Sequence, residues 1–193
     1  PLSNRRTDGY GGDRAARMRY PLEILETVCA AWPADLPLSV RISSVDGIDG
    51  GIDLADSVAF ATEAKARGAD IIDCSSGGLM GSATAARIPR GYSFQVPFAQ
   101  EIRQKADIAT MAVGLILHPQ QAEDILTDGS ADLIAIGREA LFDPNWPLHA
   151  QMALEAREVA AFAAWPKQYG WWLERREPGL RRLDGPALPF RTA

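Results

Sequence analysis

The chain has 193 residues, 47% of them hydrophobic and 23% charged, so it can bury a core and has the composition of a folded protein. Its formal net charge is −5, whereas nucleic acids and anionic membrane surfaces select for a basic excess, so we expect neither as a partner. No apolar run approaches the roughly 20 residues that span a bilayer, and the opening residues are not typical of a signal peptide, so we expect a cytoplasmic protein.

The two cysteines do not indicate a cross-link. Cys29 and Cys74 lie far apart, each in an apolar segment, which favours buried free thiols over a disulfide or a metal pair. His118 and His149 are the only histidines, so the sequence offers no metal-ligand cluster and we expect no metal.

Helical and strand patterns alternate along the chain. Asp13 is placed to cap the first helical segment, and Gly68 to end the second. Each helical segment is followed by a short apolar run, which predicts a parallel sheet. The predicted helices are residues 13–31, 53–68, 96–105 and 119–128, and the predicted strands are 38–43, 70–76, 109–114 and 132–137.

Four such units amount to half of a (β/α)8 barrel, which usually needs about 250 residues. An open doubly wound sheet can be built from the same elements, but it would normally carry a glycine-rich nucleotide loop, and no GxGxxG occurs here. One more helix is expected over 151–164. Residues 165–193 fit no barrel element, and we interpret them as an extension.

Two of the predicted strands end in glycine just before a helix, at Gly114 and at Gly137, and Arg138 follows the second. A (β/α) barrel builds a phosphate site from its last two strands in this way, because glycine lets the backbone approach an anion and the next helix offers unpaired N–H groups. Arg138 would add a two-pronged positive charge. Either run alone would be read as a strand end beside a surface arginine. The two together predict a phosphorylated cofactor or substrate.

Several strings point to a known family. The chain opens on PLSNRRTDGYGG (1–12), with RMR at 17–19. Later come VRIS (40–43), IDCSSG (72–77), AVGLI (112–116) and IGRE (136–139). In this order and spacing they resemble the old yellow enzyme family of flavin-dependent ene-reductases, particularly its bacterial branch of xenobiotic reductases. Ala15 and Ala16 depart from the Glu-Asn that is usual in the opening signature.

The resemblance implies an α/β fold in which residues 1–164 form the C-terminal half, strands 5–8, of an FMN-binding TIM barrel. Residues 165–193 would form an arm at a dimer interface. The implied cofactors are FMN and, as reductant, NADPH or NADH. The implied activity is reduction of the activated C=C bond of a small enone-type substrate, by a homo-oligomer that is at least a dimer.

The resemblance also assigns flavin contacts. Arg41 would lie against the N1/O2 edge of FMN, where a cation stabilises the charge left by hydride transfer. The alternative is a buried salt bridge from Arg41 to a carboxylate such as Asp73. The remaining implied contacts are Gly114, Gly137 and Arg138 at the phosphate, with Ser75, Ser76, Gly77 and Val113 near the ribityl chain or ring, although Ser75–Gly77 could equally be a serine-rich turn.

In the bacterial branch a C-terminal segment reaches the neighbouring subunit's active site, and Trp171 and Trp172 are the candidates here. The alternative is that both tryptophans pack the tail onto their own subunit. Tyr10 is interpreted as a loop anchor. The residues that grip the substrate carbonyl and donate the proton are expected upstream of Pro1, so we expect no catalytic residue in this chain and no activity from it alone.

Three other interpretations explain less of the sequence. No cysteine follows Cys74, which disfavours the related branch that carries an iron–sulfur cluster. A half-barrel without flavin could serve as an interaction or scaffold module. Another phosphate-binding TIM-barrel enzyme would explain Gly137 and Arg138, but neither Arg41 nor the opening string.

Overall fold

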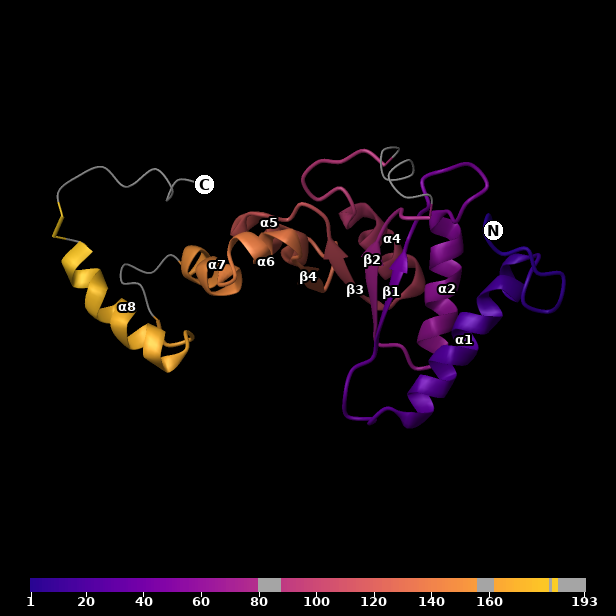
Figure 1. Cartoon of the computed structure of the whole chain (residues 1–193), viewed down its shortest axis with the longest axis horizontal. Helices are drawn as coiled ribbons and strands as arrows, with labels where there is room; N and C mark the ends of the chain where they lie inside the picture. The colour runs from indigo at the N-terminus through magenta and orange to yellow at the C-terminus, as the bar shows by residue number, and fades with distance from the viewer. Residues whose placement is uncertain (80–87, 156–161, 181, 184–193) are drawn as a thin grey trace. The chain divides into compact units, whose positions relative to one another are not determined.

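A four-stranded, fully parallel sheet organises the computed structural model, which describes residues 1–79, 88–155, 162–180 and 182–183 (Figure 1). The strands are β1 (Ser39–Ser43), β2 (Ile71–Ser75), β3 (Ala109–Val113) and β4 (Leu133–Ala135), in that order across the sheet. The helices are α1 (Arg14–Ala31), α2 (Leu54–Ala66), α4 (Val96–Ala106), α5 (Pro119–Thr127), α6 (Arg138–Phe142), α7 (Trp146–Leu154) and α8 (Lys167–Leu180). Each strand pairs with the next one along the chain, so the predicted α/β half-barrel fold is confirmed.

Local signals in the sequence set the helix starts. The carboxylate of Asp13 accepts the N–H of Ala16 and caps α1, as predicted. Asp53 and Asp56 form a reciprocal capping box at the start of α2. Gly68, which follows α2, has a φ of +98°, a conformation that favours glycine.

The core lies on one face of the sheet. Ile72 and Cys74 of β2 and Ala112 of β3 have no exposed surface, and α4 packs against both strands with its buried Ile102. Burial raises the pKa of the Cys74 thiol to about 12. Cys74 is therefore a buried, protonated free thiol, as predicted.

The opposite face of the sheet carries polar and partly exposed residues. The strand register places Arg41, Asp73, Met111 and Leu133 in one row across β1 to β4. In a closed (β/α)8 barrel such a row faces the interior. The sheet register therefore puts the arginine of β1 and the carboxylate of β2 side by side on that face.

The C-terminal part departs from the sequence prediction. The helix expected over 151–164 is wrong in position, because α7 begins five residues earlier, at Trp146, with Pro147 in its first turn, and ends at Leu154. Residues 156–161 lie outside the described ranges, and a turn closed by the Trp165 N–H on the Phe162 carbonyl follows them.

The chain divides into two compact units, residues 1–142 and 143–193. The predicted boundary at 164/165 separates barrel sequence from extension and stays a prediction. None of the described helices is long and apolar enough to cross a membrane.

Candidate functional site

Two of the predicted glycines line one cavity at the carboxyl ends of β3 and β4. The cavity has a volume of about 140 Å³. Its lining comes from two residues just before α4, and from the end of each strand with the residues that follow it: Phe94, Gln95, Val113, Gly114, Leu115, Ile116, Leu117, Ala135, Ile136, Gly137, Arg138 and Glu139. The structure thus brings together four of the residues predicted to contact a phosphorylated ligand.

Gly114 and Gly137 differ in what surrounds them. Gly114 has a φ of +123°, and a Cβ there would lie 2.9 Å from a ring carbon of Phe94 and 3.0 Å from Nε2 of Gln95. Only glycine fits this position without strain. A Cβ on Gly137 would meet no atom within 4 Å, so the Gly137 backbone faces open space that a ligand can enter.

Arg138 supplies a free positive charge beside this cavity. It is exposed and is the first residue of α6. Within the described ranges its side chain forms no hydrogen bond or ion pair. The guanidinium is therefore available to an anion, a geometry for which arginine is well suited.

Arg41 presents its guanidinium on the sheet face that lacks the core. Its side chain is 70% exposed, and its Nε donates a hydrogen bond to Oγ of Ser75 at 3.0 Å. The distance from Nε to Oδ2 of Asp73 is 3.8 Å. The ion pair with Asp73 exists, but the arginine is not buried, so the alternative of a buried salt bridge is wrong in that respect.

Asp73 is the less accessible member of this pair. Burial raises the pKa of its carboxyl, and the charge of Arg41 opposes that rise. Its Oδ1 is buried and has no hydrogen-bond partner in the described part of the chain. Buried polar atoms are ordinarily paired, so this oxygen is available to a further group.

A hydrogen-bond chain ties the end of β2 to the end of β3. Ser76 Oγ donates to Oε1 of the buried Gln95 at 2.6 Å, and Gln95 Nε2 donates to the Val113 carbonyl at 3.1 Å. Gly77 donates its N–H to the Val45 carbonyl. Ser76 and Gly77 therefore shape the turn beside the cavity. Gln95 was missed from the sequence, because nothing in its local pattern shows that its partners lie at the ends of two strands.

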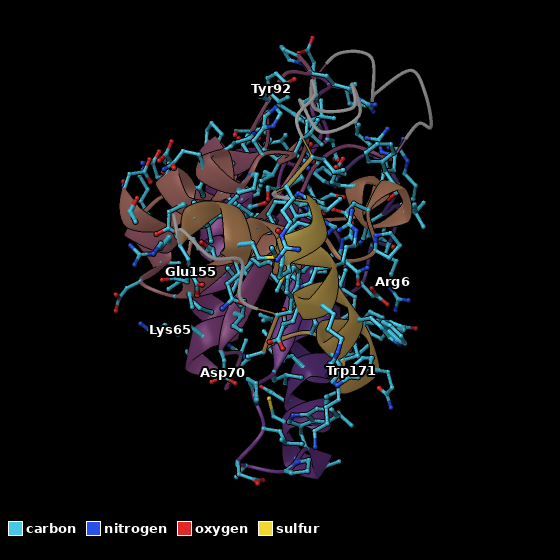
Figure 2. All side chains as sticks on the ribbon, turned by 90° about the vertical axis from the view of Figure 1, so that its left-hand side faces the viewer. Arg6, Lys65, Asp70, Tyr92, Glu155 and Trp171 are labelled. Carbon is cyan, nitrogen blue, oxygen red and sulfur yellow. The ribbon has the colours of Figure 1, made fainter. Side chains whose placement is uncertain are left out.

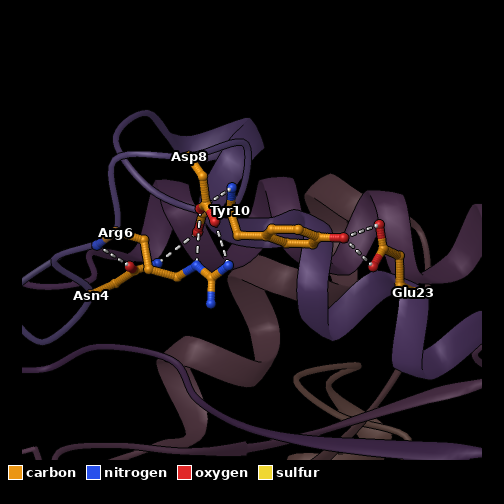
Figure 3. Close-up of polar contacts among 5 residues, drawn as sticks. All are labelled: Asn4, Arg6, Asp8, Tyr10 and Glu23. Carbon is orange, nitrogen blue, oxygen red and sulfur yellow. Dashed lines mark hydrogen bonds and ion pairs between the residues drawn. The ribbon is translucent and has the colours of Figure 1, made fainter.

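The opening segment forms an anchored loop, which Figure 3 shows. The Asn4 side chain donates to the Tyr10 carbonyl at 2.8 Å, and the carboxylate of Asp8 pairs with Arg6. The Tyr10 hydroxyl donates to Glu23 on α1 at 3.1 Å. Tyr10 thus anchors this loop to a helix, as predicted.

The tryptophans of the extension lie on α8, where Figure 2 labels Trp171. Trp171 and Trp172 are 47% and 66% exposed, and their rings meet edge to face with centroids 4.5 Å apart. The guanidinium of Arg175 stacks over Trp171 at 3.4 Å. Two exposed indoles on one short helix form an apolar surface of the kind that anchors protein interfaces.

Comparison with known sequences points to one family. The model of the "NADH:flavin oxidoreductase / NADH oxidase family" matches residues 1–157. The NADPH dehydrogenase of Bacillus subtilis (strain 168) is 47% identical over 173 residues, covering 89% of this chain and 48% of that protein. The NADPH dehydrogenase of Halalkalibacterium halodurans is 44% identical over 169 residues, covering 88% and 47%. The chain spans about half the length of these curated relatives.

Solved structures agree on the fold. A complex of 2-naphthoyl-CoA reductase with 2-naphthoyl-CoA superposes with a TM-score of 0.69 at 23% identity, covering 83% of this chain and 25% of that one. Histamine dehydrogenase from Rhizobium sp. 4-9 superposes with a TM-score of 0.66 at 22% identity, covering 83% and 24%. At these identities the likeness shows the fold alone.

Proposed function

Because the chain belongs to the NADH:flavin oxidoreductase / NADH oxidase family, which uses FMN with NADPH or NADH, we propose that the carboxyl ends of its strands hold FMN. The observation that carries the proposal is the cavity between β3 and β4, where the Gly137 backbone is open and Arg138 has no partner among the residues that the structure describes. The backbone at Gly114 and Gly137 and the guanidinium of Arg138 would hold the phosphate.

Arg41 would hold the flavin ring at its N1/O2 edge. The guanidinium is exposed, and Oδ1 of Asp73 has no hydrogen-bond partner in the described ranges, so both fit a polar group placed over this row of the sheet. Ser76, Gly77 and Val113 would line the path between ring and phosphate. The proposal joins these residues because Ser76, Gly77 and Val113 lie at the carboxyl ends of the strands, and the guanidinium of Arg41, from the middle of β1, reaches Ser75 at the end of β2.

The proposed reaction is the NAD(P)H-dependent reduction of the C=C bond of an α,β-unsaturated carbonyl compound. FMN, when bound, supplies the hydride transfer. This chain's residues would bind the cofactor and set the charge beside its ring, with Arg41 stabilising negative charge that develops there. The groups that grip the carbonyl and supply the proton would come from an amino-terminal half like that of the curated relatives.

The proposal is tested by combining the chain with the amino-terminal barrel half of a relative. The chain is purified alone, and also after co-expression with the amino-terminal half of the B. subtilis NADPH dehydrogenase, and each is assayed anaerobically with FMN, NADPH and 2-cyclohexenone. We expect flavin-dependent turnover only from the assembled halves. Robust turnover by the chain alone would contradict the half-enzyme account, and failure of the assembled halves to bind FMN would contradict the cofactor assignment.

We also propose that the enzyme is a cytoplasmic homo-oligomer in which Trp171 or Trp172 enters the mouth of a partner subunit's active site. Their exposure on α8 supports this, because tryptophan buries a large area with few rotatable bonds. Removing residues 165–193 from the assembled enzyme should reduce its mass in light scattering and alter its enone kinetics. An unchanged mass with unchanged kinetics would mean that the tail only packs on its own subunit.

A further inference from the structure

Asp73 lies beside Arg41 without a hydrogen bond to it. The 3.8 Å from Asp73 Oδ2 to Arg41 Nε exceeds hydrogen-bond range, and Oδ1 has no partner in the described part of the chain. Because buried carboxylates normally accept hydrogen bonds, an Asp73 that accepts none from its neighbours calls for an explanation other than local stability.

Ser75, rather than Asp73, fixes where Arg41 points. Its hydroxyl accepts the hydrogen bond of Arg41 Nε at 3.0 Å, one strand away and two residues beyond Asp73. In the described structure the two terminal nitrogens of Arg41 have no protein hydrogen bond. Asp73 therefore acts on the guanidinium through charge, while Ser75 acts through geometry.

The surroundings of Asp73 make its charge effective. Its side chain is 17% exposed, and its neighbour across the sheet on β3 is the uncharged Met111. Water screens such a carboxylate less than one on the surface. Arg41 is the charged residue that the strand register pairs with it, so the row holds one positive and one negative charge side by side.

We propose that Asp73 is a positioning residue that acts through Arg41, its negative charge offsetting part of the guanidinium's charge and so limiting how strongly the site favours reduced over oxidised FMN. This inference rests on the proposed FMN site. Reduced FMN carries more negative charge at its N1/O2 edge than oxidised FMN does. A fully uncompensated Arg41 would therefore favour the reduced form more strongly, and Asp73 moderates that preference.

The test measures binding of oxidised and of chemically reduced FMN, with no turnover involved. The chain is assembled with the amino-terminal half of the B. subtilis NADPH dehydrogenase, and both dissociation constants are determined at pH 8. Asp73→Asn should raise the ratio of the dissociation constant of oxidised FMN to that of reduced FMN about tenfold. This corresponds to a positive shift of about 30 mV in the two-electron reduction potential of bound FMN. Ser75→Ala should shift the ratio the other way, because it releases Arg41.

Two matched controls accompany these variants. Asp73→Glu keeps the charge and should stay near the unsubstituted ratio. Asp132→Asn makes the same charge change at an aspartate that pairs with Arg103, at the amino end of the sheet, and should leave the ratio unchanged. If Asp73→Asn does not fold, Asp73→Ser provides a smaller neutral side chain for the same measurement.

The outcomes separate this inference from the proposed function. FMN binding with an unchanged or lowered ratio in Asp73→Asn overturns the role of Asp73 and leaves the FMN site standing. No FMN binding by the unsubstituted assembly overturns the FMN site and this inference with it.

Discussion

The two ends of the sheet use the same charged residue types in opposite ways. At the amino end, Asp132 accepts two hydrogen bonds from Arg103, at 2.9 and 3.0 Å, and a third from the Thr110 N–H at 2.9 Å. At the carboxyl end, Arg138 has no partner among the described residues. Arg41 lies in the middle of β1, 3.8 Å from Asp73, and its guanidinium reaches Ser75 at the end of β2, but its two terminal nitrogens form no hydrogen bond with a described residue. Within the described structure, Arg103 is thus held by two hydrogen bonds to a carboxylate, whereas the guanidinium groups of Arg138 and Arg41 keep donors open to a ligand.

This difference indicates which charged residues of a parallel α/β sheet are candidates for binding a ligand. Paired charges at the amino end tie a helix to a strand and contribute to stability, whereas unpaired charges beside open glycine backbone offer binding energy to a ligand. An arginine beside a strand end is uninformative on its own. Hydrogen bonds from the guanidinium to a carboxylate, present at Arg103 and not observed for Arg41 or Arg138 in the described structure, separate the two roles.

Glycine substitutions at the carboxyl end should give the largest effect. Gly114→Ala places a Cβ at 2.9 Å from Phe94 at a φ of +123°, and should lower the free energy of unfolding by about 2–4 kcal/mol. Gly137→Ala is the matched control, because its Cβ meets no atom within 4 Å, and should cost less than about 0.5 kcal/mol while weakening FMN binding. Urea unfolding measures the free energy of unfolding of both variants. Equal destabilisation by the two variants would contradict the described cavity.

Arginine substitutions compare the two ends directly. Arg138→Ala should weaken FMN binding by about 1.5–3 kcal/mol, the value of a hydrogen bond to a charged group, and leave the unfolding midpoint unchanged. Arg103→Ala should lower the unfolding midpoint, because Asp132 loses its cation, and leave FMN affinity unchanged. The two effects are read from fluorescence titration and urea unfolding. An Arg103 variant that loses FMN affinity would break the comparison.

The pH dependence of stability should have opposite signs for Asp132, at the amino end of the sheet, and for Asp73, in the middle of β2, with effects below about 1 kcal/mol. Hydrogen bonds from Arg103 lower the pKa of Asp132, so its contribution is present above the ordinary carboxyl pKa near 3.9 and is lost as the pH falls through the lowered value. Burial raises the pKa of Asp73, so stability is instead lost as the pH rises from about 4 through the raised value.

Asparagine variants isolate these two contributions. Asp132→Asn should flatten the loss of stability on the acid side of about pH 4, and Asp73→Asn should flatten the loss on the alkaline side of it. Urea unfolding between pH 3 and pH 7 gives both profiles. A change of the same sign in the two variants would contradict the assigned pKa directions.

The sequence predicted the sheet and its helices because their signals are local. Asp13 and Gly68 mark helix ends whatever surrounds them, and short apolar runs between helices leave few alternatives to parallel strands. The glycines that end β3 and β4 were identified for the same reason.

Other features depend on contacts that no local pattern encodes. Gln95 bridges two strands through Ser76 and a backbone carbonyl, so its role appears only in three dimensions. The helix α8 contains Gly170 and Pro178, two residues that disfavour helices, so the sequence pattern did not predict a helix there. Strand β4 is shorter than its apolar run, ending at Ala135.

The central claim is that the glycine-lined cavity and Arg138 hold the phosphate of FMN. Its most direct test compares the affinities of FMN and of riboflavin, which lacks the phosphate, for the chain assembled with the amino-terminal half of the B. subtilis NADPH dehydrogenase. We predict that FMN binds at least tenfold more tightly than riboflavin and that Arg138→Ala removes most of this difference. Equal affinities for the two flavins, or a preference for FMN that survives Arg138→Ala unchanged, would contradict the account.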